Sequence, residues 1–137
     1  MKIAKEFRWE MGHRLPEHFG NCKNIHGHSY KMILEVEGDM NPAGMIIDFY
    51  DLEKIVNPII DQLDHAFLVY KEDKEIIEFL QKMNSKMVIV DFQSTVENIC
   101  TYFLKEIKKA EFPDNVKGIA VRVYETEGDY AKDTIEL

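Results

Sequence analysis

The sequence predicts an α+β fold, in which an antiparallel β-sheet of two strand pairs carries two long helices on one face. Apolar and polar residues alternate over two early segments, 2–11 and 28–38, as they do in half-buried strands. The alternation returns near the end of the chain, over 116–125 and 130–137. Amphipathic helical segments lie between these two pairs of strands. Because the strand pairs and the helices are segregated along the chain, antiparallel pairing with the helices on one face is expected.

A polar loop separates the first two expected strands. Residues 12–27 contain turn-forming residues throughout, namely Gly12, Pro16, Gly20, Asn21, Asn24 and Gly27. The strand over 28–38 places four apolar side chains on one face, those of Tyr30, Met32, Leu34 and Val36. Turn residues at 38–39 and 41–44 then end the first strand pair.

The first long helix is expected over residues 50–63, where apolar residues recur every three or four positions. Asp48 or Asp51 can serve as its N-cap. Pro58 lies inside the segment and is expected to kink or split the helix, because proline cannot donate the backbone hydrogen bond. A short charged helix is predicted next, over residues 72–83.

The second long helix is expected to begin at Ser94 or Thr95, since Glu97 supplies part of a capping box. Cys100 lies on the apolar stripe of this helix, which predicts a small core residue rather than a reactive thiol. The preceding segment, 87–92, is either a short strand or a packed extended segment.

Composition limits the classes of function. The chain has 137 residues, 45% of them hydrophobic, which fits a single domain over residues 1–137 with a substantial core. A net charge of −8 argues against nucleic acid as a partner, since phosphate contacts need clustered Lys and Arg. No apolar run approaches the ~18 residues of a membrane span, and the charged start, 1–6, lacks the core of a secretion signal. The cytoplasm is therefore the expected location.

Three histidines are the most informative residues of the chain. His26 and His28 flank Gly27, and in an extended segment their side chains point to the same face. His13 follows the first alternating segment, so pairing of the two strands would bring all three rings to one point. Three neutral nitrogen ligands without a fourth protein ligand are typical of a catalytic zinc site that keeps one position open.

Cys22 precedes this histidine pair, and two interpretations of its thiol remain open. In the first, Cys22 is a reactive group beside an open metal site, because a nearby cation favours the thiolate. In the second, Cys22 is the fourth ligand of a closed structural zinc site without catalytic activity. Cys100 is far away in sequence, and a disulfide between the two is not expected in the cytoplasm.

The chain resembles the 6-pyruvoyltetrahydropterin synthase / 6-carboxytetrahydropterin synthase family over nearly its whole length. The resemblance rests on six motifs that occur in the family's order. They are Gly12–Pro16, Cys22–Tyr30, Gly44–Phe49, Leu63–His65, Ser94–Asn98 and Tyr124–Thr126. It implies the tunnelling fold, in which strands of several subunits join into a barrel with active sites between subunits. It also implies a homo-oligomer, in this family usually a hexamer made of two trimers.

The resemblance also implies roles for individual residues. His13, His26 and His28 correspond to the ligands of a Zn²⁺ cofactor, and Cys22 to the catalytic thiol. Asp64 and His65 correspond to a pair that relays protons. Glu125 corresponds to the anchor for the pterin ring, with Thr95 and Glu97 supporting the pocket. The implied partner is a small-molecule substrate, 7,8-dihydroneopterin triphosphate. Arg14, Lys23 and Lys31 are candidate contacts for its triphosphate.

Two branches of the family differ in their product. One releases acetaldehyde and makes 6-carboxytetrahydropterin for queuosine, and the other makes 6-pyruvoyltetrahydropterin for tetrahydrobiopterin. Only three residues separate Cys22 from His26, which resembles the bacterial carboxy branch. Ser94, where many bacterial members have proline, and the long charged segment 71–93 depart from that branch. We therefore expect a zinc-dependent lyase of the carboxy type, with the pyruvoyl synthase as the alternative. A pterin-binding protein without catalytic activity is a third possibility.

Overall fold

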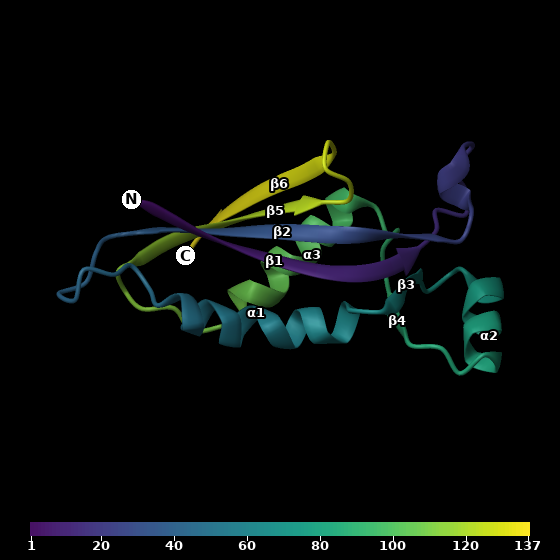
Figure 1. The fold of residues 1–137 in the computed structure, drawn as a ribbon, viewed down its shortest axis with the longest axis horizontal. Helices are drawn as coiled ribbons and strands as arrows, with labels where there is room; N and C mark the ends of the chain where they lie inside the picture. The colour runs from purple at the N-terminus through teal and green to yellow at the C-terminus, as the bar shows by residue number, and fades with distance from the viewer.

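The computed structural model describes residues 1–137 and contains a mixed six-stranded sheet in the order β4-β3-β1-β2-β5-β6. Two long helices, α1 and α3, cover one face of the sheet, and the shorter α2 lies at one end of the molecule (Figure 1). The elements are β1 (Lys2–His13), the single helical turn η1 (Asn21–Lys23), β2 (His26–Gly38), α1 (Phe49–Leu63), β3 (Ala66–Tyr70), α2 (Lys74–Lys82), β4 (Met87–Val90), α3 (Val96–Lys108), β5 (Val116–Tyr124) and β6 (Tyr130–Glu136). The expected α+β class and the two long helices are confirmed.

The prediction of an antiparallel sheet of two strand pairs is wrong in one respect, because the sheet has six strands and is mixed. β1, β2, β5 and β6 form the antiparallel part, whereas β3 pairs parallel with β1 and β4 pairs parallel with β3. β3 was not expected at all. Four of its five residues are buried, so it is a continuous apolar run without the alternation that marks a half-buried strand. α2 forms the crossover that a parallel β3–β4 pair requires.

The two strands that carry the histidines are longer than predicted. β1 continues to His13 and β2 already begins at His26, so the expected loop over 12–27 is confined to residues 14–25. His13 is the register partner of His26, and Met11 is the partner of His28. Side chains directly opposite each other in an antiparallel pair lie on the same face. The strand pairing therefore brings the imidazoles together at one end of the sheet.

Both long helices begin with a side-chain cap. The Asp48 carboxylate accepts a hydrogen bond from the Tyr50 amide at 2.8 Å, and α1 remains one helix across Pro58 rather than splitting there. At α3 the Thr95 hydroxyl accepts from the Asn98 amide at 3.2 Å. The capping box expected from Glu97 is not formed, because the helix begins one residue later than that pattern requires.

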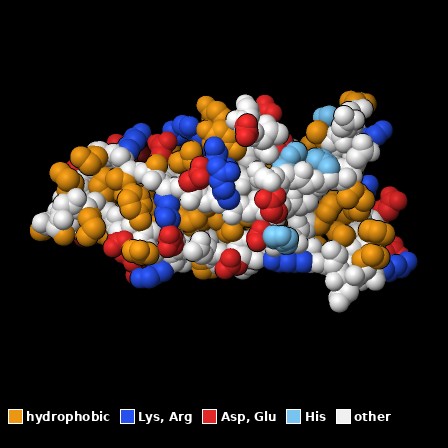
Figure 2. Space-filling view, viewed as in Figure 1, with side chains coloured by type: hydrophobic (Ala, Val, Ile, Leu, Met, Phe, Trp, Pro, Cys, Tyr) orange, Lys and Arg blue, Asp and Glu red, His pale blue; other side chains and the backbone are white.

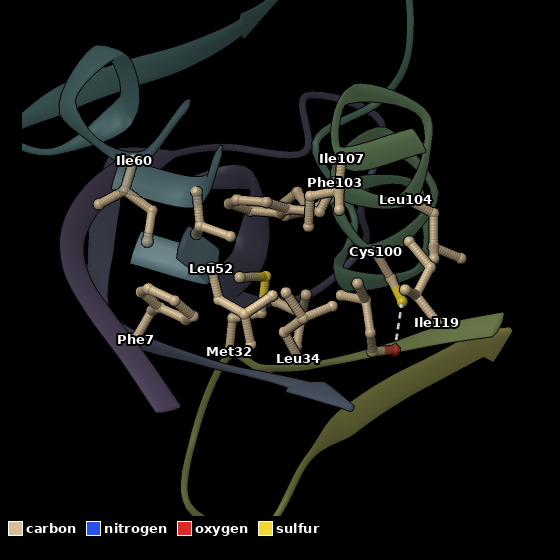
Figure 3. Packing of buried hydrophobic residues seen from close by; sticks show 14 of the residues in the cluster. Phe7, Met32, Leu34, Leu52, Ile60, Cys100, Phe103, Leu104, Ile107 and Ile119 are labelled. Carbon is tan, nitrogen blue, oxygen red and sulfur yellow. Dashed lines mark hydrogen bonds between the residues drawn. The ribbon is translucent and has the colours of Figure 1, made fainter. Parts of the chain in front are cut away.

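The hydrophobic core lies between the sheet and the helices α1 and α3. Phe7, Met32 and Leu34 of the sheet pack against Leu52 of α1 and Phe103 of α3 (Figure 3). Cys100 is buried in this layer, and its thiol donates to the Val121 carbonyl oxygen at 3.2 Å. The prediction that Cys100 is a core residue is confirmed. None of the helices combines the length and apolar character needed to cross a membrane.

Candidate metal centre

Three imidazoles form a cluster at the end of the core layer. His13 lies on the same face of β1 as the core residues Trp9 and Met11, and His28 on the same face of β2 as Tyr30. The ligating nitrogens of His13, His26 and His28 all lie within 4.8 Å of one another. Histidine side chains are visible at the surface on the half of the molecule that also carries α2, although Figure 2 does not distinguish the cluster from the other histidines. The cluster is thus a continuation of the core in which imidazoles replace apolar side chains.

Backbone carbonyls determine which nitrogen of two of these rings faces the cluster. His13 Nδ1 lies 2.7 Å from the Ser94 carbonyl oxygen, and His26 Nδ1 lies 2.7 Å from the Asn24 carbonyl oxygen. Since a carbonyl can only accept, each Nδ1 carries the proton and each Nε2 keeps a free lone pair. Such a hydrogen bond fixes both the tautomer and the orientation of a ligating imidazole.

The buried nitrogens of the cluster lack hydrogen-bond donors. Nε2 of His13 and Nε2 of His28 are buried without a hydrogen-bond partner, and the His13 side chain is 1% exposed. Burial lowers the pKa of His13 to about 4 despite the opposing effect of the Ser94 carbonyl, and burial also lowers the pKa of His28. Both rings are therefore neutral near pH 7. Neutral imidazoles with unpaired lone pairs are the donor set that zinc prefers, so these residues fit a Zn²⁺ ion.

Glu125 lies directly beside the cluster, immediately after the end of β5. Its Oε1 atom is 3.3 Å from His13 Nε2 and 3.6 Å from His28 Nε2. Burial raises the pKa of Glu125, and the negative charges of Glu97 and Asp129 act in the same direction. The sequence-based expectation assigned this carboxylate to the pterin ring. The geometry adds that it also faces the open side of the histidine cluster.

Cys22 is not part of the cluster of ligand atoms. It lies in η1, within the loop that joins β1 to β2, and its side chain is half-exposed. Its carbonyl oxygen accepts from the Leu15 amide at 2.8 Å, which holds the two ends of this loop together. The structure thus places Cys22 on the segment directly connecting His13 to His26, without bringing its sulfur into the histidine group.

Asp64 and His65 form a pair, as expected from their chemistry. His65 Nδ1 lies 3.0 Å from Asp64 Oδ2, and the other carboxylate oxygen accepts from the Glu10 amide at 2.9 Å. The Glu10 N–H is the largest cause that lowers the pKa of Asp64, and His65 adds to the effect. His65 has a φ of 58°, a left-handed conformation that is uncommon for a residue other than glycine. Such conformations concentrate at functional sites.

The Asp64–His65 pair lies on the opposite face of the sheet from the histidine cluster. His65 lines a shallow cavity of about 330 Å³ together with Glu10 and Ser29, and His28 of the cluster borders the same cavity. Glu10 and Ser29 are register partners whose side chains hydrogen-bond at 2.7 Å, and they alternate with the core-facing residues Met11 and His28. One copy of the chain therefore does not bring the pair to the same side as His13.

The N-terminus of α3 contributes the remaining expected residues. Thr95 acts as the helix cap, and Glu97 is an exposed residue of the first turn whose charge acts on Glu125. Sequence reasoning missed the contact of Ser94, which is 1% exposed and whose carbonyl orients His13. It also missed Tyr30, a buried ring 5.5 Å from the His28 ring whose hydroxyl has no partner. Tyr30 could have been found from its position on the core face of β2, the face that also carries His28.

The mixed sheet with two covering helices and a three-imidazole cluster at its end defines an α+β protein with a site of the kind that binds transition metals. The model of the 6-pyruvoyl tetrahydropterin synthase family matches residues 2–134, and the chain belongs to this family. A Haemophilus influenzae protein named 6-carboxy-5,6,7,8-tetrahydropterin synthase is 39% identical, with 91% of this chain and 92% of that protein covered.

Two further comparisons agree with this family. An Aquifex aeolicus protein with the same name is 28% identical over 91% of this chain and 92% of its own length. The crystal structure of 6-pyruvoyl tetrahydropterin synthase from Plasmodium vivax superposes with a TM-score of 0.80, covering 100% of this chain and 98% of that one. Its sequence identity is 20%, so this likeness shows the fold.

Proposed function

We propose that the protein is a zinc-dependent lyase. It converts 7,8-dihydroneopterin triphosphate and one water molecule to 6-carboxy-5,6,7,8-tetrahydropterin, acetaldehyde and triphosphate, a step of queuosine biosynthesis. The observation that carries the proposal is the convergence of three imidazoles, two of them with buried and unpaired Nε2 atoms, in a family of pterin synthases. The relatives named for the carboxy product support this choice of branch.

His13, His26 and His28 would hold the zinc ion. All three ligands are neutral, so they leave the charge of the cation undiminished. When bound, zinc supplies Lewis-acid polarisation and orientation of the hydroxyls on the pterin side chain. The buried position of His13 and the carbonyl of Ser94 keep its ring fixed for this role.

Cys22 acts as the base that removes a proton from the substrate side chain. Its loop joins the two strands that carry the candidate metal ligands, so Cys22 lies close in sequence to both His13 and His26. A thiol close to a cation has its thiolate form favoured. Asp64 orients His65 through their 3.0 Å contact, which suits this pair to donate or accept a proton.

Glu125 anchors the amino-pyrimidine edge of the pterin ring. Its carboxylate has two oxygens that can accept parallel hydrogen bonds from such an edge. Its partial burial favours a ligand that supplies these donors, since a buried carboxylate without donors is costly. Thr95 fixes the start of α3 beside this pocket, and Glu97 adds negative charge to it.

The active form is a homo-oligomer, a hexamer made of two trimers, located in the cytoplasm. The position of His65 on the opposite sheet face from His13 supports an assembly in which each site combines residues of neighbouring copies. Asp64 and His65 of one copy then serve the metal centre of the next. No nucleic acid or membrane takes part.

The pyruvoyl synthase is the second candidate. Ser94, which stands where many bacterial members of the carboxy branch have proline, keeps this alternative open. The short separation of Cys22 from His26 favours the carboxy product. A non-catalytic zinc site with Cys22 as fourth ligand is less well supported, because the thiol is not in the ligand cluster.

Product analysis tests the proposal. Zinc-loaded protein is incubated with 7,8-dihydroneopterin triphosphate, and the products are identified by mass spectrometry and by an assay for acetaldehyde. A carboxy-pterin with acetaldehyde is expected. A pyruvoyl-pterin would establish the second candidate instead, and unchanged substrate would exclude both.

A further inference from the structure

The N-terminus of α2 shows an unusual use of its capping residue. Asp73 occupies the N-cap position, where an aspartate normally accepts a hydrogen bond from an amide of the first turn. The Asp73 side chain makes no such bond. Its side chain is 7% exposed, and the carboxylate is directed away from the helix backbone toward the loop after β1. The Asp73 side chain thus makes another contact instead of capping α2.

That contact is a two-pronged ion pair with Arg14. Arg14 Nε lies 2.8 Å from Asp73 Oδ2, and its terminal Nη2 lies 2.6 Å from Asp73 Oδ1. Bidentate pairs of this kind fix both the distance and the orientation of the two groups. Asp73 also raises the pKa of Arg14. Because Asp73 pairs with its charge in this way, Arg14 is a poor candidate for the triphosphate contact that was predicted from the sequence.

Arg14 stands at the base of the loop that carries Cys22. The next residue, Leu15, donates its amide to the Cys22 carbonyl at 2.8 Å, so Cys22 is one hydrogen bond away from the residue beside Arg14. Figure 1 shows α2 at the same end of the molecule as this loop. By contrast the loop tip is open to solvent, and the side chain of Phe19 is fully exposed.

A second anchor holds the backbone of Arg14. The buried hydroxyl of Ser94 donates to the Arg14 carbonyl at 3.3 Å, and the Ser94 carbonyl accepts from His13. Asp73 and Ser94 lie at the two ends of the long charged segment between β3 and α3. Two residues of this segment, Asp73 and Ser94, therefore contact Arg14 at the base of the loop. Arg14 directly follows the candidate metal ligand His13.

We propose that the Arg14–Asp73 pair is a positioning device, through which α2 fixes the Cys22 loop relative to the metal centre. Arg14 and Asp73 lie outside the histidine cluster, and they act through the backbone of residues 14–22. The inference rests on the proposed role of Cys22, and it gives a function to the charged segment that the family resemblance does not explain.

The test compares Asp73→Asn with Glu75→Gln. Glu75 lies on the same helix, 4.0 Å from the same guanidinium, and its side chain is 92% exposed. Glu75→Gln therefore also removes one negative charge near Arg14, but it leaves the two-pronged contact with Asp73 intact. For both variants we measure the rate of Cys22 alkylation by iodoacetamide in a Cys100→Ser background, zinc affinity by chelator competition, and steady-state kinetics. Melting temperatures show whether each variant is folded.

Asp73→Asn is expected to alkylate several-fold faster and to lose about tenfold or more in kcat, because a displaced catalytic group lowers turnover steeply. Its KM and zinc affinity should stay close to those of the parent, and Glu75→Gln should match the parent in all measurements. Arg14→Lys keeps the charge but not the fork, so it should fall between the two. Unchanged alkylation in Asp73→Asn, or equal effects in both variants, would overturn the proposal.

Two further results of the experiment, an unfolded variant and an inactive parent protein, also have a defined meaning. If Asp73→Asn does not fold, Arg14→Lys carries the test against the same control, and unchanged alkylation in it overturns the proposal. If the parent protein shows no turnover with the pterin substrate, the proposed function fails. The alkylation rates still decide whether the ion pair fixes the loop, since they require no catalysis.

Discussion

At the scale of single residues, His13 combines a core position with the chemistry of a candidate metal ligand. Its side chain continues the row of Trp9 and Met11 on β1, and the same burial that excludes water keeps the ring neutral. The Ser94 carbonyl uses its Nδ1 proton, so Nε2 is left for a metal. A buried histidine of this kind makes the stability of the metal-free protein depend on pH.

The folded-state pKa of His13, about 4, lies below the ordinary value of 6.5. On acidification the unfolded chain therefore takes up the proton first. The neutral His13 ring therefore makes its full contribution to the free energy of unfolding above pH 6.5. That contribution falls by on the order of 3 kcal/mol as the pH falls toward 4. Urea unfolding of the metal-free protein across this range measures the loss.

His13→Gln removes this titration and should flatten the decline, whereas His18→Gln, at an exposed loop position, should leave it unchanged. Equal pH dependence in His13→Gln and the parent protein would show that His13 is not buried as a neutral ring.

The two thiols are predicted to differ in reactivity. Burial raises the pKa of Cys100 to about 11, so almost none of it is thiolate near neutral pH, whereas Cys22 lies half-exposed on its loop. A disulfide reagent should modify one thiol of the native, metal-free protein rapidly and the second only after unfolding. Cys22→Ser should abolish the rapid phase, and Cys100→Ser should retain it. Two rapid phases in the native protein would contradict the structure.

At the scale of elements, much of the fold was predictable because alternation and helical periodicity are local patterns. The strands over 116–125 and 130–137 and both long helices agree with the structure within a few residues. β3 was missed because a strand buried on both faces has no alternation, and only its neighbours β1 and β4 define it. The extension of β1 to His13 was missed because Gly12 suggests a turn when the partner strand is unknown.

The site was predictable to a similar degree. The spacing of His26 and His28 marks a shared strand face, and the pairing with His13 was a hypothesis that the register confirms. The contact of Ser94 with His13 joins residues 81 positions apart, and no local pattern encodes it. The separation of His65 from the cluster likewise depends on how β3 is placed next to β1.

The start of α3 connects helix capping to the metal centre. Thr95 caps α3, and the preceding residue holds His13, so loss of the cap should loosen the second contact as well. Thr95→Ala is expected to cost about 1 kcal/mol of unfolding free energy. It should also weaken zinc binding by about tenfold or more, because contacts of this kind tune metal affinity.

Asp48→Ala provides the matched control. It removes the equivalent cap of α1, which lies far from the histidines in the chain. The expected loss of unfolding free energy is again about 1 kcal/mol. Zinc affinity should remain that of the parent protein. The comparison of chelator competition curves separates a local effect at the centre from general destabilisation, and equal zinc affinities in both variants would refute the coupling.

At the scale of the whole molecule, the distribution of functional residues over both faces of the sheet is the main feature. The histidine cluster faces the core side, while His65 lies in the cavity of the other face with Glu10 and Ser29. We expect a site that uses both sets to draw them from two copies of the chain.

Subunit complementation tests this assembly. Cys22→Ala and His65→Ala should each be inactive as pure oligomers, because every site lacks one group. When the two variants are unfolded together and refolded as mixed oligomers, some sites combine His65 of one copy with Cys22 of another. Activity should then reappear, at a fraction set by the mixing ratio. If the two groups served a site within one chain, each mixed oligomer would stay inactive, because no chain would carry both. Separately refolded variants that are mixed afterwards provide the control for exchange.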